Sequence, residues 1–300
     1  MAVVGWIGLG NMGGPMSANM VKAGHDVRGF DLNPEAVAAA EAAGVKPVAS
    51  IADAVNGADV VFTMLPKGDH ARAVYLEGDG VFAHAGTGTL LVDSSTIDVE
   101  SARALHEAAA EGGFRFVDAP VSGGISGAQA GTLTFMVGGE DGAVRDASGF
   151  IGPMSGNIIP TGAATTGQAA KICNNLMLFI NLAATAEGAV LADRLGLDKQ
   201  VFWDIASVSS GDSWALRTWY PVPGVVSTAA SNNDFEPTFT AELANKDINL
   251  AIAAAKETET PLEIGEHVQQ LFQRLIDSGQ AGKDCSQIIK LVDDSLNQAN

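Results

Sequence analysis

The pattern of hydrophobic and polar positions changes near residue 164. Before it, short apolar runs typical of buried strands occur at residues 3–7, 26–30, 59–64, 89–93, 114–118, 131–139 and 157–161. Stretches with helical spacing lie between several of them, at residues 15–23, 34–43, 51–56 and 99–110. Strands that alternate with helices are typical of a parallel sheet covered on both faces. We therefore predict an N-terminal doubly wound, Rossmann-type α/β domain over residues 1–164.

After residue 164 the apolar positions follow helical periods and predict no strand. Residues 168–195 contain no proline, and a helix of 28 residues (195 − 168 + 1) would be about 40 Å long. Gly167 before it reads as the end of a turn, and Asn181 and Glu187 interrupt the apolar run, which favours a core helix over a membrane span. We predict an all-helical domain over residues 165–300, built on this helix and serving substrate binding and oligomerisation.

A glycine motif follows the first predicted strand and precedes a helix. In Gly8-Leu9-Gly10-Asn11-Met12-Gly13, the first glycine permits a tight turn, the second a close approach to a pyrophosphate, and the third close helix packing. Asp31 ends the second strand, 18 residues (31 − 13) after Gly13. An acid at this spacing accepts the ribose hydroxyls and repels a 2′-phosphate. The sequence therefore predicts NAD rather than NADP as the cofactor.

Two further segments follow buried strands, where open α/β sheets bind their ligands. Met64-Leu65-Pro66 ends the strand at residues 59–64, and Ser94-Ser95-Thr96 ends the strand at residues 89–93. The hydroxyl groups suit the ribose or the nicotinamide. Alternatively they cap the next helix, a role open to Thr96 and to Asp98.

Two polar groups are candidates for substrate contacts. Ser122-Gly123-Gly124 can present a hydroxyl and consecutive backbone N–H groups to a carboxylate, although a glycine-rich turn without a ligand is the alternative. Lys171, Asn174 and Asn175 share one face of the long helix and must meet polar partners there. Lys246 is a second candidate cation, or an exposed lysine near the start of a helix.

Composition excludes several classes of function. The net charge of −18 disfavours binding to nucleic acid or an anionic membrane; salt adaptation is an alternative reason for it. Cys173, Cys285 and five scattered histidines form no metal-ligand spacing, so we expect no metal. We see no secretory signal at the start of the sequence and expect a cytoplasmic protein.

Taken together, the motifs resemble the β-hydroxyacid dehydrogenase family. They are the glycine motif, Met64-Leu65-Pro66, Asp118-Ala119-Pro120-Val121-Ser122-Gly123-Gly124, Gly131-Thr132-Leu133, Gly167-Gln168-x-x-Lys171-x-x-Asn174-Asn175, Lys246-Asp247 and Gly282-x-Asp284-x-Ser286. The resemblance covers nearly the whole chain. It implies a catalytic lysine at Lys171, a carboxylate site at Ser122, Gly123 and Gly124, cofactor contacts at Leu65, Pro66, Thr96 and Lys246, and a homodimer or homotetramer. His70 departs from the asparagine common in related chains.

The family's chemistry implies oxidation of a small 3-hydroxy acid by NAD. Residues 219–224 resemble the branch that oxidises 3-hydroxyisobutyrate to methylmalonate semialdehyde in valine degradation. We expect burial to lower the pKa of Lys171 from the ordinary lysine value of about 10.4 so that it serves as general acid and base, while Asn175 orients the substrate. Alternatives are a tartronate semialdehyde reductase, an L-serine or broad 3-hydroxy acid dehydrogenase, and a non-catalytic NAD-binding module.

Overall fold

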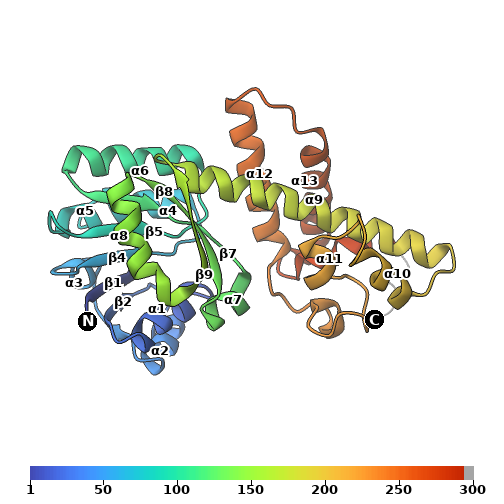
Figure 1. The fold of residues 1–300 in the computed structure, drawn as a ribbon, viewed down its shortest axis with the longest axis horizontal. Helices are drawn as coiled ribbons and strands as arrows, with labels where there is room; N and C mark the ends of the chain where they lie inside the picture. Colours follow the sequence, from blue (N-terminus) through green and yellow to red (C-terminus); the bar gives the residue numbers. More distant parts are fainter. Residues whose placement is uncertain (294–300) are drawn as a thin grey trace. The chain divides into compact units, whose positions relative to one another are not determined.

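The computed structural model describes residues 1–293 and contains two compact units, Met1–Lys171 and Ile172–Asn300 (Figure 1). The boundary that we predict, at residue 164, lies just before helix α9 (Thr166–Arg194), whereas the contacts divide the chain within this helix. The difference of seven residues (171 − 164) arises because the first turn of α9 packs against strand ends of the first unit.

One sheet organises the first unit. Its strands are β1 (Val3–Ile7), β2 (Asp26–Phe30), β3 (Lys46–Pro47), β4 (Val60–Thr63), β5 (Leu90–Asp93), β6 (Arg115–Asp118), β7 (Val121–Ser122), β8 (Leu133–Gly139) and β9 (Ser155–Gly162). The order is β3-β2-β1-β4-β5-β6-β8-β7, and β9 pairs with β8. Strands β1 to β6 are parallel, which confirms the prediction of a doubly wound sheet. Strand β8 runs antiparallel to β6 and extends the sheet beyond the part that strand–helix alternation predicts.

Helices cover both faces of this sheet (Figure 1). They are α1 (Gly13–Lys22), α2 (Pro34–Ala42), α3 (Ile51–Val55), α4 (Gly68–Leu76), α5 (Val81–His84), α6 (Val99–Gly112), α7 (Gly124–Ala130) and α8 (Asp141–Ile151). Successive strand side chains point to opposite faces, so Trp6 packs in the core beneath α1, α2 and α8, and Ile7 in the core beneath α3 to α6. Helices α4, α5, α7 and α8 are absent from the sequence-based prediction.

The described part of the second unit is helical and contains no β-strand. After α9 come α10 (Lys199–Ala206), α11 (Trp214–Thr218), α12 (Ala241–Glu257) and α13 (Glu263–Leu275), with short helical turns at Ala230–Asn233, Ile276–Gln280 and Cys285–Leu291. Phe179 of α9 stacks with Trp219 and Phe239 in a common apolar core. Thr240 caps α12 through the N–H of Leu243, so this helix begins at Ala241.

Helix α9 is long and apolar enough to cross a bilayer, judged by length and composition alone. The core helix of a soluble protein meets the same criterion. Of its most apolar window of 18 residues, 44% is buried inside the protein, and the buried side chains include Phe179 and Leu182. Its apolar character is therefore accounted for in part by packing.

Candidate active site

The glycine turn after β1 is shaped by close backbone contacts. Gly8 has φ +94°, donates its N–H to Phe30 O at 2.9 Å, and would place a Cβ 2.2 Å from Met64 O. A Cβ on Gly13 would lie 1.9 Å from Gly8 O. Both positions therefore exclude larger residues. A Cβ on Gly10 would meet no atom within 4 Å, so open space lies beside this residue.

The start of α1 fits a phosphate group. Met12, at the N-cap position, makes no side-chain capping bond, and the first turn contains no acidic residue. The first N–H groups of a helix need partners, and an anion satisfies them best. Exposed Gly10 and Asn11 border this helix start. The residues present therefore fit the pyrophosphate of a dinucleotide.

Asp31 follows β2 beside the glycine turn. Its Oδ2 accepts the N–H of Leu9 at 2.6 Å, and its Oδ1 accepts the N–H of Asn33 at 2.7 Å. The carboxylate therefore also holds the glycine turn in place, a role that its spacing alone does not predict. Each carboxylate oxygen has a second lone pair, and the side chain is partly exposed, so it can still accept ribose hydroxyls.

The loops after β4 and β5 are linked to each other. Leu65 donates its N–H to Ser95 Oγ at 2.8 Å, and Ser95 Oγ donates to Asp93 Oδ1 at 2.6 Å. Ser95 is buried, so our expectation that its hydroxyl faces a ribose or nicotinamide is wrong. Thr96 is half-buried and remains a candidate contact, as do half-buried Met64 and exposed Pro66. Asp98, the alternative considered from the sequence, caps α6 through the N–H of Ser101 at 2.6 Å.

Asp93 at the end of β5 is buried in a network of polar groups. Its Oδ1 accepts Thr63 Oγ1 at 2.7 Å, and Tyr75 OH lies 3.0 Å from that hydroxyl. Burial raises the pKa of Asp93 to about 6, against the opposing effect of hydrogen bonds from Ser95 and Thr63. Burial and the nearby Asp93 carboxylate raise the pKa of Tyr75 well above its ordinary value.

The segment Ser122–Gly124 lies between β7 and α7. Gly123 has φ +133° and Gly124 has φ +65°, and both are exposed. Such left-handed conformations favour glycine, and they turn successive backbone N–H groups toward one side. The geometry is compatible with carboxylate binding.

Lys171 lies in the second turn of α9 and is only 8% exposed. Asn175 follows one turn later, is 3% exposed, and donates its Nδ2 to Asp247 Oδ2 at 2.6 Å. Lys246 Nζ forms an ion pair with Asp247 Oδ1 at 3.2 Å. Asn174 is exposed and donates to Asn175 Oδ1 at 3.1 Å. The structure therefore joins Asn175 and Lys246 through Asp247.

Asp247 is a candidate site residue that the sequence-based list omits. The sequence feature that could have identified it is its position next to Lys246. Asp247 is buried in α12, and a buried acid needs a charged or hydrogen-bonding partner. Lys246 itself lies in the second turn of α12 and is half-buried, so it is not an exposed lysine at a helix start.

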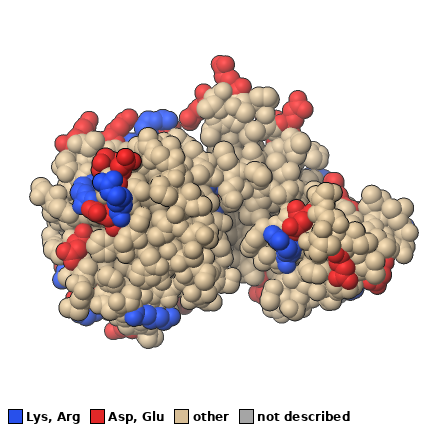
Figure 2. All heavy atoms as spheres, in the orientation of Figure 1, with Lys and Arg blue, Asp and Glu red and all other residues tan. Residues whose placement is uncertain are grey.

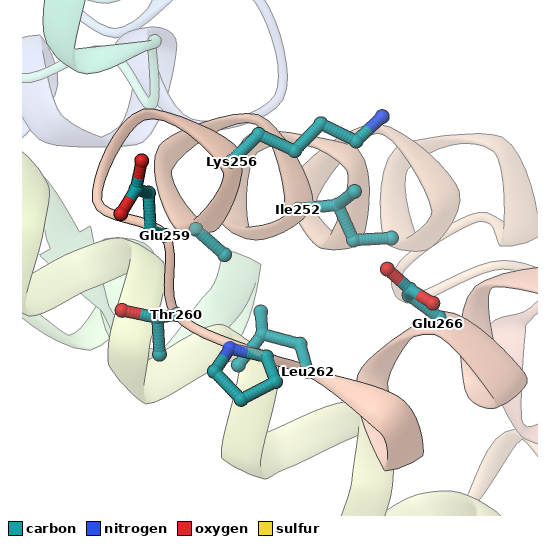
Figure 3. A pocket seen from close by; sticks show the side chains of 8 residues that line it. Ile252, Lys256, Glu259, Thr260, Leu262 and Glu266 are labelled. Carbon is teal, nitrogen blue, oxygen red and sulfur yellow. The ribbon is translucent and has the colours of Figure 1, made fainter.

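The hollow in the second unit lies apart from the candidate site residues. A hollow of about 370 Å³ lies at the turn between α12 and α13, and none of the predicted site residues lines it (Figure 3). Its charged lining residues are Lys256, Glu259 and Glu266. In residues 1–293, no group of three or more His, Cys, Asp or Glu side chains could hold a metal ion.

Comparison with known proteins assigns both parts of the chain. Residues 3–162 match the NAD binding domain of 6-phosphogluconate dehydrogenase, and residues 165–292 match the domain described as NAD-binding of NADP-dependent 3-hydroxyisobutyrate dehydrogenase. The cofactor is thus a nicotinamide dinucleotide.

Similar proteins cover nearly all of the chain. A probable 3-hydroxyisobutyrate dehydrogenase of Mycobacterium tuberculosis is 46% identical over 96% of this chain and 97% of its own. An NAD-dependent L-serine dehydrogenase of Pseudomonas aeruginosa is 43% identical over 99% of this chain and all of its own (100%). The solved structure of a Mycobacterium tuberculosis 3-hydroxyisobutyrate dehydrogenase with L-serine aligns with a TM-score of 0.91, at 46% identity, over 98% of this chain and 99% of that one. The chain therefore belongs to the 3-hydroxyisobutyrate dehydrogenase family of β-hydroxyacid dehydrogenases.

Proposed function

We propose that the protein oxidises 3-hydroxyisobutyrate to methylmalonate semialdehyde with NAD, as a step of valine degradation. The observation that carries the proposal is the buried Lys171 on α9, in a chain whose glycine turn and helix α1 fit a dinucleotide. Lys171 is only 8% exposed, and a buried position is typical of lysines that serve as general bases. In this family setting, proton transfer is the task that its position supports.

The chemistry divides between binding and proton transfer. The glycine turn and the start of α1 would hold NAD, which would supply the hydride acceptor for oxidation of the substrate's carbinol carbon. Lys171 takes the hydroxyl proton at its Nζ and returns it in the reverse direction; such a group contributes about 10²–10⁴ in rate. The backbone N–H groups of Gly123 and Gly124 and the hydroxyl of Ser122 bind the substrate carboxylate. Asn175 and Lys246 make further polar contacts with the substrate, and Lys246 also contacts the cofactor.

Asp247 supports these two side chains. It accepts the Nδ2 of Asn175 at 2.6 Å, while Asn175 Oδ1 accepts Asn174 Nδ2 at 3.1 Å, and Asp247 lies 3.2 Å from Lys246 Nζ. Buried at 3% exposure, this carboxylate holds the amide and the ammonium group in fixed orientations.

The choice of NAD over NADP rests on Asp31. Its carboxylate stands beside the glycine turn, where a 2′-phosphate would meet a negative charge. One of the two matching domains is described from an NADP-dependent enzyme, so the cofactor preference of this chain is set by its own residue at position 31. The other proposed cofactor contacts are Gly8, Gly10, Asn11, Met12, Gly13, Met64, Leu65, Pro66 and Thr96.

L-serine is the second candidate substrate, because one relative is named an L-serine dehydrogenase and one similar structure contains L-serine. Both molecules are small 3-hydroxy acids, so one carboxylate site and one lysine serve either. A reductase of tartronate semialdehyde stays an alternative with less support.

We propose further that the protein is a cytoplasmic homodimer or homotetramer. Helix α9 exposes Met177 and Leu191, and α10 exposes Val201 and Ile205. Apolar side chains repeated on neighbouring helices are suited to contact with another copy. Acidic residues outnumber basic ones, 35 to 17, and on the face in Figure 2 the basic side chains lie beside acidic ones, which disfavours nucleic acid as a partner.

The test of the catalytic proposal is the Lys171→Ala variant. We expect turnover to fall at least about 100-fold, with NAD binding retained. Lys256→Ala is the matched control, because it removes an exposed lysine from α12 and changes the net charge equally. Near-normal turnover of Lys171→Ala would rule the proposal out.

A further inference from the structure

The first turn of α9 is capped by a carboxylate from a distant strand. Asp118, the last residue of β6, accepts the N–H of Thr165 at Oδ1 (3.0 Å) and the N–H of Gln168 at Oδ2 (2.8 Å). His106 Nε2 of α6 lies 2.8 Å from Asp118 Oδ1. A carboxylate at this place satisfies N–H groups that the helix cannot satisfy itself. The start of α9 is therefore tied to the end of β6.

Two glycines allow this close approach. A Cβ on Gly167 would lie 2.5 Å from Asp118 O and 2.6 Å from Met136 O. A Cβ on Gly138 of β8 would lie 2.7 Å from Gly167 N. Gly167 thus lies within the first turn of α9 and is required there by packing, not by the turn that the sequence suggests.

The side chain of Gln168 extends the connection to the cofactor edge of the sheet. It is completely buried, donates its Nε2 to Ser95 O at 2.7 Å, and accepts the N–H of Ile97 at Oε1 (3.2 Å). Ser95 in turn accepts the N–H of Leu65. One amide therefore links the first turn of α9 with the loop after β5 and, through Ser95, with the loop after β4.

We propose that Gln168 is a positioning residue for the dehydrogenase reaction, because it fixes Lys171 relative to the loops that contact the cofactor. Lys171 follows Gln168 by three residues, so both lie on one face of α9, about one turn apart. A displacement of about 1 Å at a reacting group can cost about 100-fold in rate. The inference rests on the proposed role of Lys171.

The first test replaces Gln168 by methionine, which keeps the length of the side chain and removes both hydrogen bonds. We expect the single-turnover rate of NADH formation, measured by stopped flow at saturating NAD and 3-hydroxyisobutyrate, to fall about 10–100-fold. The dissociation constant of NAD should change less than about threefold, since the glycine turn and Asp31 are untouched.

The matched control is Thr89→Val. Thr89 is buried and donates to Ala58 O at 2.9 Å at the start of β5, the opposite end from Ser95. The Thr89→Val variant, like Gln168→Met, loses a buried hydrogen bond, so its melting temperature should fall. Its single-turnover rate should nevertheless equal that of the wild type. A Gln168→Met rate within twofold of the wild type, or equal to that of Thr89→Val, overturns the proposal.

Gln168→Glu is a second variant that separates positioning from folding. A protonated glutamate can donate to Ser95 O and accept from Ile97 N–H, as the amide does, whereas the ionised form cannot donate. Asp118 and Asp93 lie near this position, and His106 lies beyond Asp118. We expect its rate relative to the wild type to decrease as the pH rises. A ratio that is constant with pH overturns the proposal.

The outcomes separate this inference from the proposed function. If Lys171→Ala is inactive and the Gln168 variants lose only thermal stability, the role of Gln168 is structural and the proposed function stands. If Lys171→Ala retains normal turnover, the proposed function fails first.

Discussion

The buried carboxylate of Asp93 allows a quantitative prediction about stability. Its Oδ1 accepts three hydrogen bonds, from Thr63 Oγ1 and from the N–H and Oγ of Ser95, while its Oδ2 is buried without a hydrogen-bond partner. Asparagine at this position keeps the accepting oxygen and carries no charge. The variant Asp93→Asn therefore removes the charge that burial penalises and preserves the three bonds.

The magnitude follows from the pKa shift. The pKa of Asp93 rises from 3.8 to about 6, chiefly through burial. Two units correspond to at most about 3 kcal/mol, at about 1.4 kcal/mol per unit. Because the folded pKa is the higher one, the protonated form stabilises the fold below about pH 4, and this contribution is lost as the pH rises through about 6. Relative to the wild type, Asp93→Asn should thus gain stability as the pH rises from about 4 through about 6, and keep that gain up to pH 8.

The assay is thermal unfolding of both proteins at pH 4, 5, 6 and 8. The difference in melting temperature should increase with pH, toward at most about 6–12 °C at pH 8, since about 1 kcal/mol corresponds to about 2–4 °C in a chain of this size. Asp69→Asn removes an exposed carboxylate of α4 and controls for the change in net charge. A difference between Asp93→Asn and wild type that stays constant over this pH range would refute the reasoning.

Three further predictions concern separate parts of the chain. Gly8→Ala should destabilise the fold by at least about 1–3 kcal/mol and weaken NADH binding in a fluorescence titration, because φ is +94° and the new Cβ would meet Met64 O; unchanged binding would contradict this. Asp31→Ser should lower kcat/KM for NAD at least about tenfold and reduce the ratio of kcat/KM for NAD to kcat/KM for NADP. An unchanged ratio would show that the acid has no part in the choice of cofactor. Asp284→Ala should lower the melting temperature, at a cost of at least about 2 kcal/mol, because the buried carboxylate accepts hydrogen bonds from Thr238, Phe239 and Ser286; an unchanged transition would show these bonds to be dispensable.

Much of the fold could be predicted because its signals are local. The glycine motif and the apolar strands predicted the parallel, doubly wound sheet, and the absence of proline between residues 168 and 195 predicted the long helix. Helix α8 contains Gly142 and Gly149, which weaken helical propensity and conceal its pattern. The antiparallel pairing of β8 depends on contacts between distant segments and has no local signal.

The candidate site was predictable by residue type and less so by orientation. A serine at a strand end can turn its hydroxyl outward or inward, and Ser95 turns inward to Asp93 and to Leu65 N–H. Glycine is required at position 167 because a Cβ there would collide with the backbone oxygens of residues 118 and 136, and this contact exists only in the folded chain. The sequence could not show that Asp247 bonds to Asn175 or that Gln168 bonds to Ser95, because these hydrogen bonds join residues that are 72 and 73 positions apart.

The most direct test of the central claim is the initial rate of NADH formation with 3-hydroxyisobutyrate, L-serine, 3-hydroxypropionate and glycerate, each measured with NAD and with NADP. The account predicts the highest kcat/KM for 3-hydroxyisobutyrate with NAD. A higher value for L-serine or glycerate would preserve the fold and the role of Lys171 but contradict the proposed substrate, and a preference for NADP would contradict the role of Asp31. Absence of turnover with all four substrates and both cofactors would contradict the claim that the protein is a 3-hydroxy acid dehydrogenase.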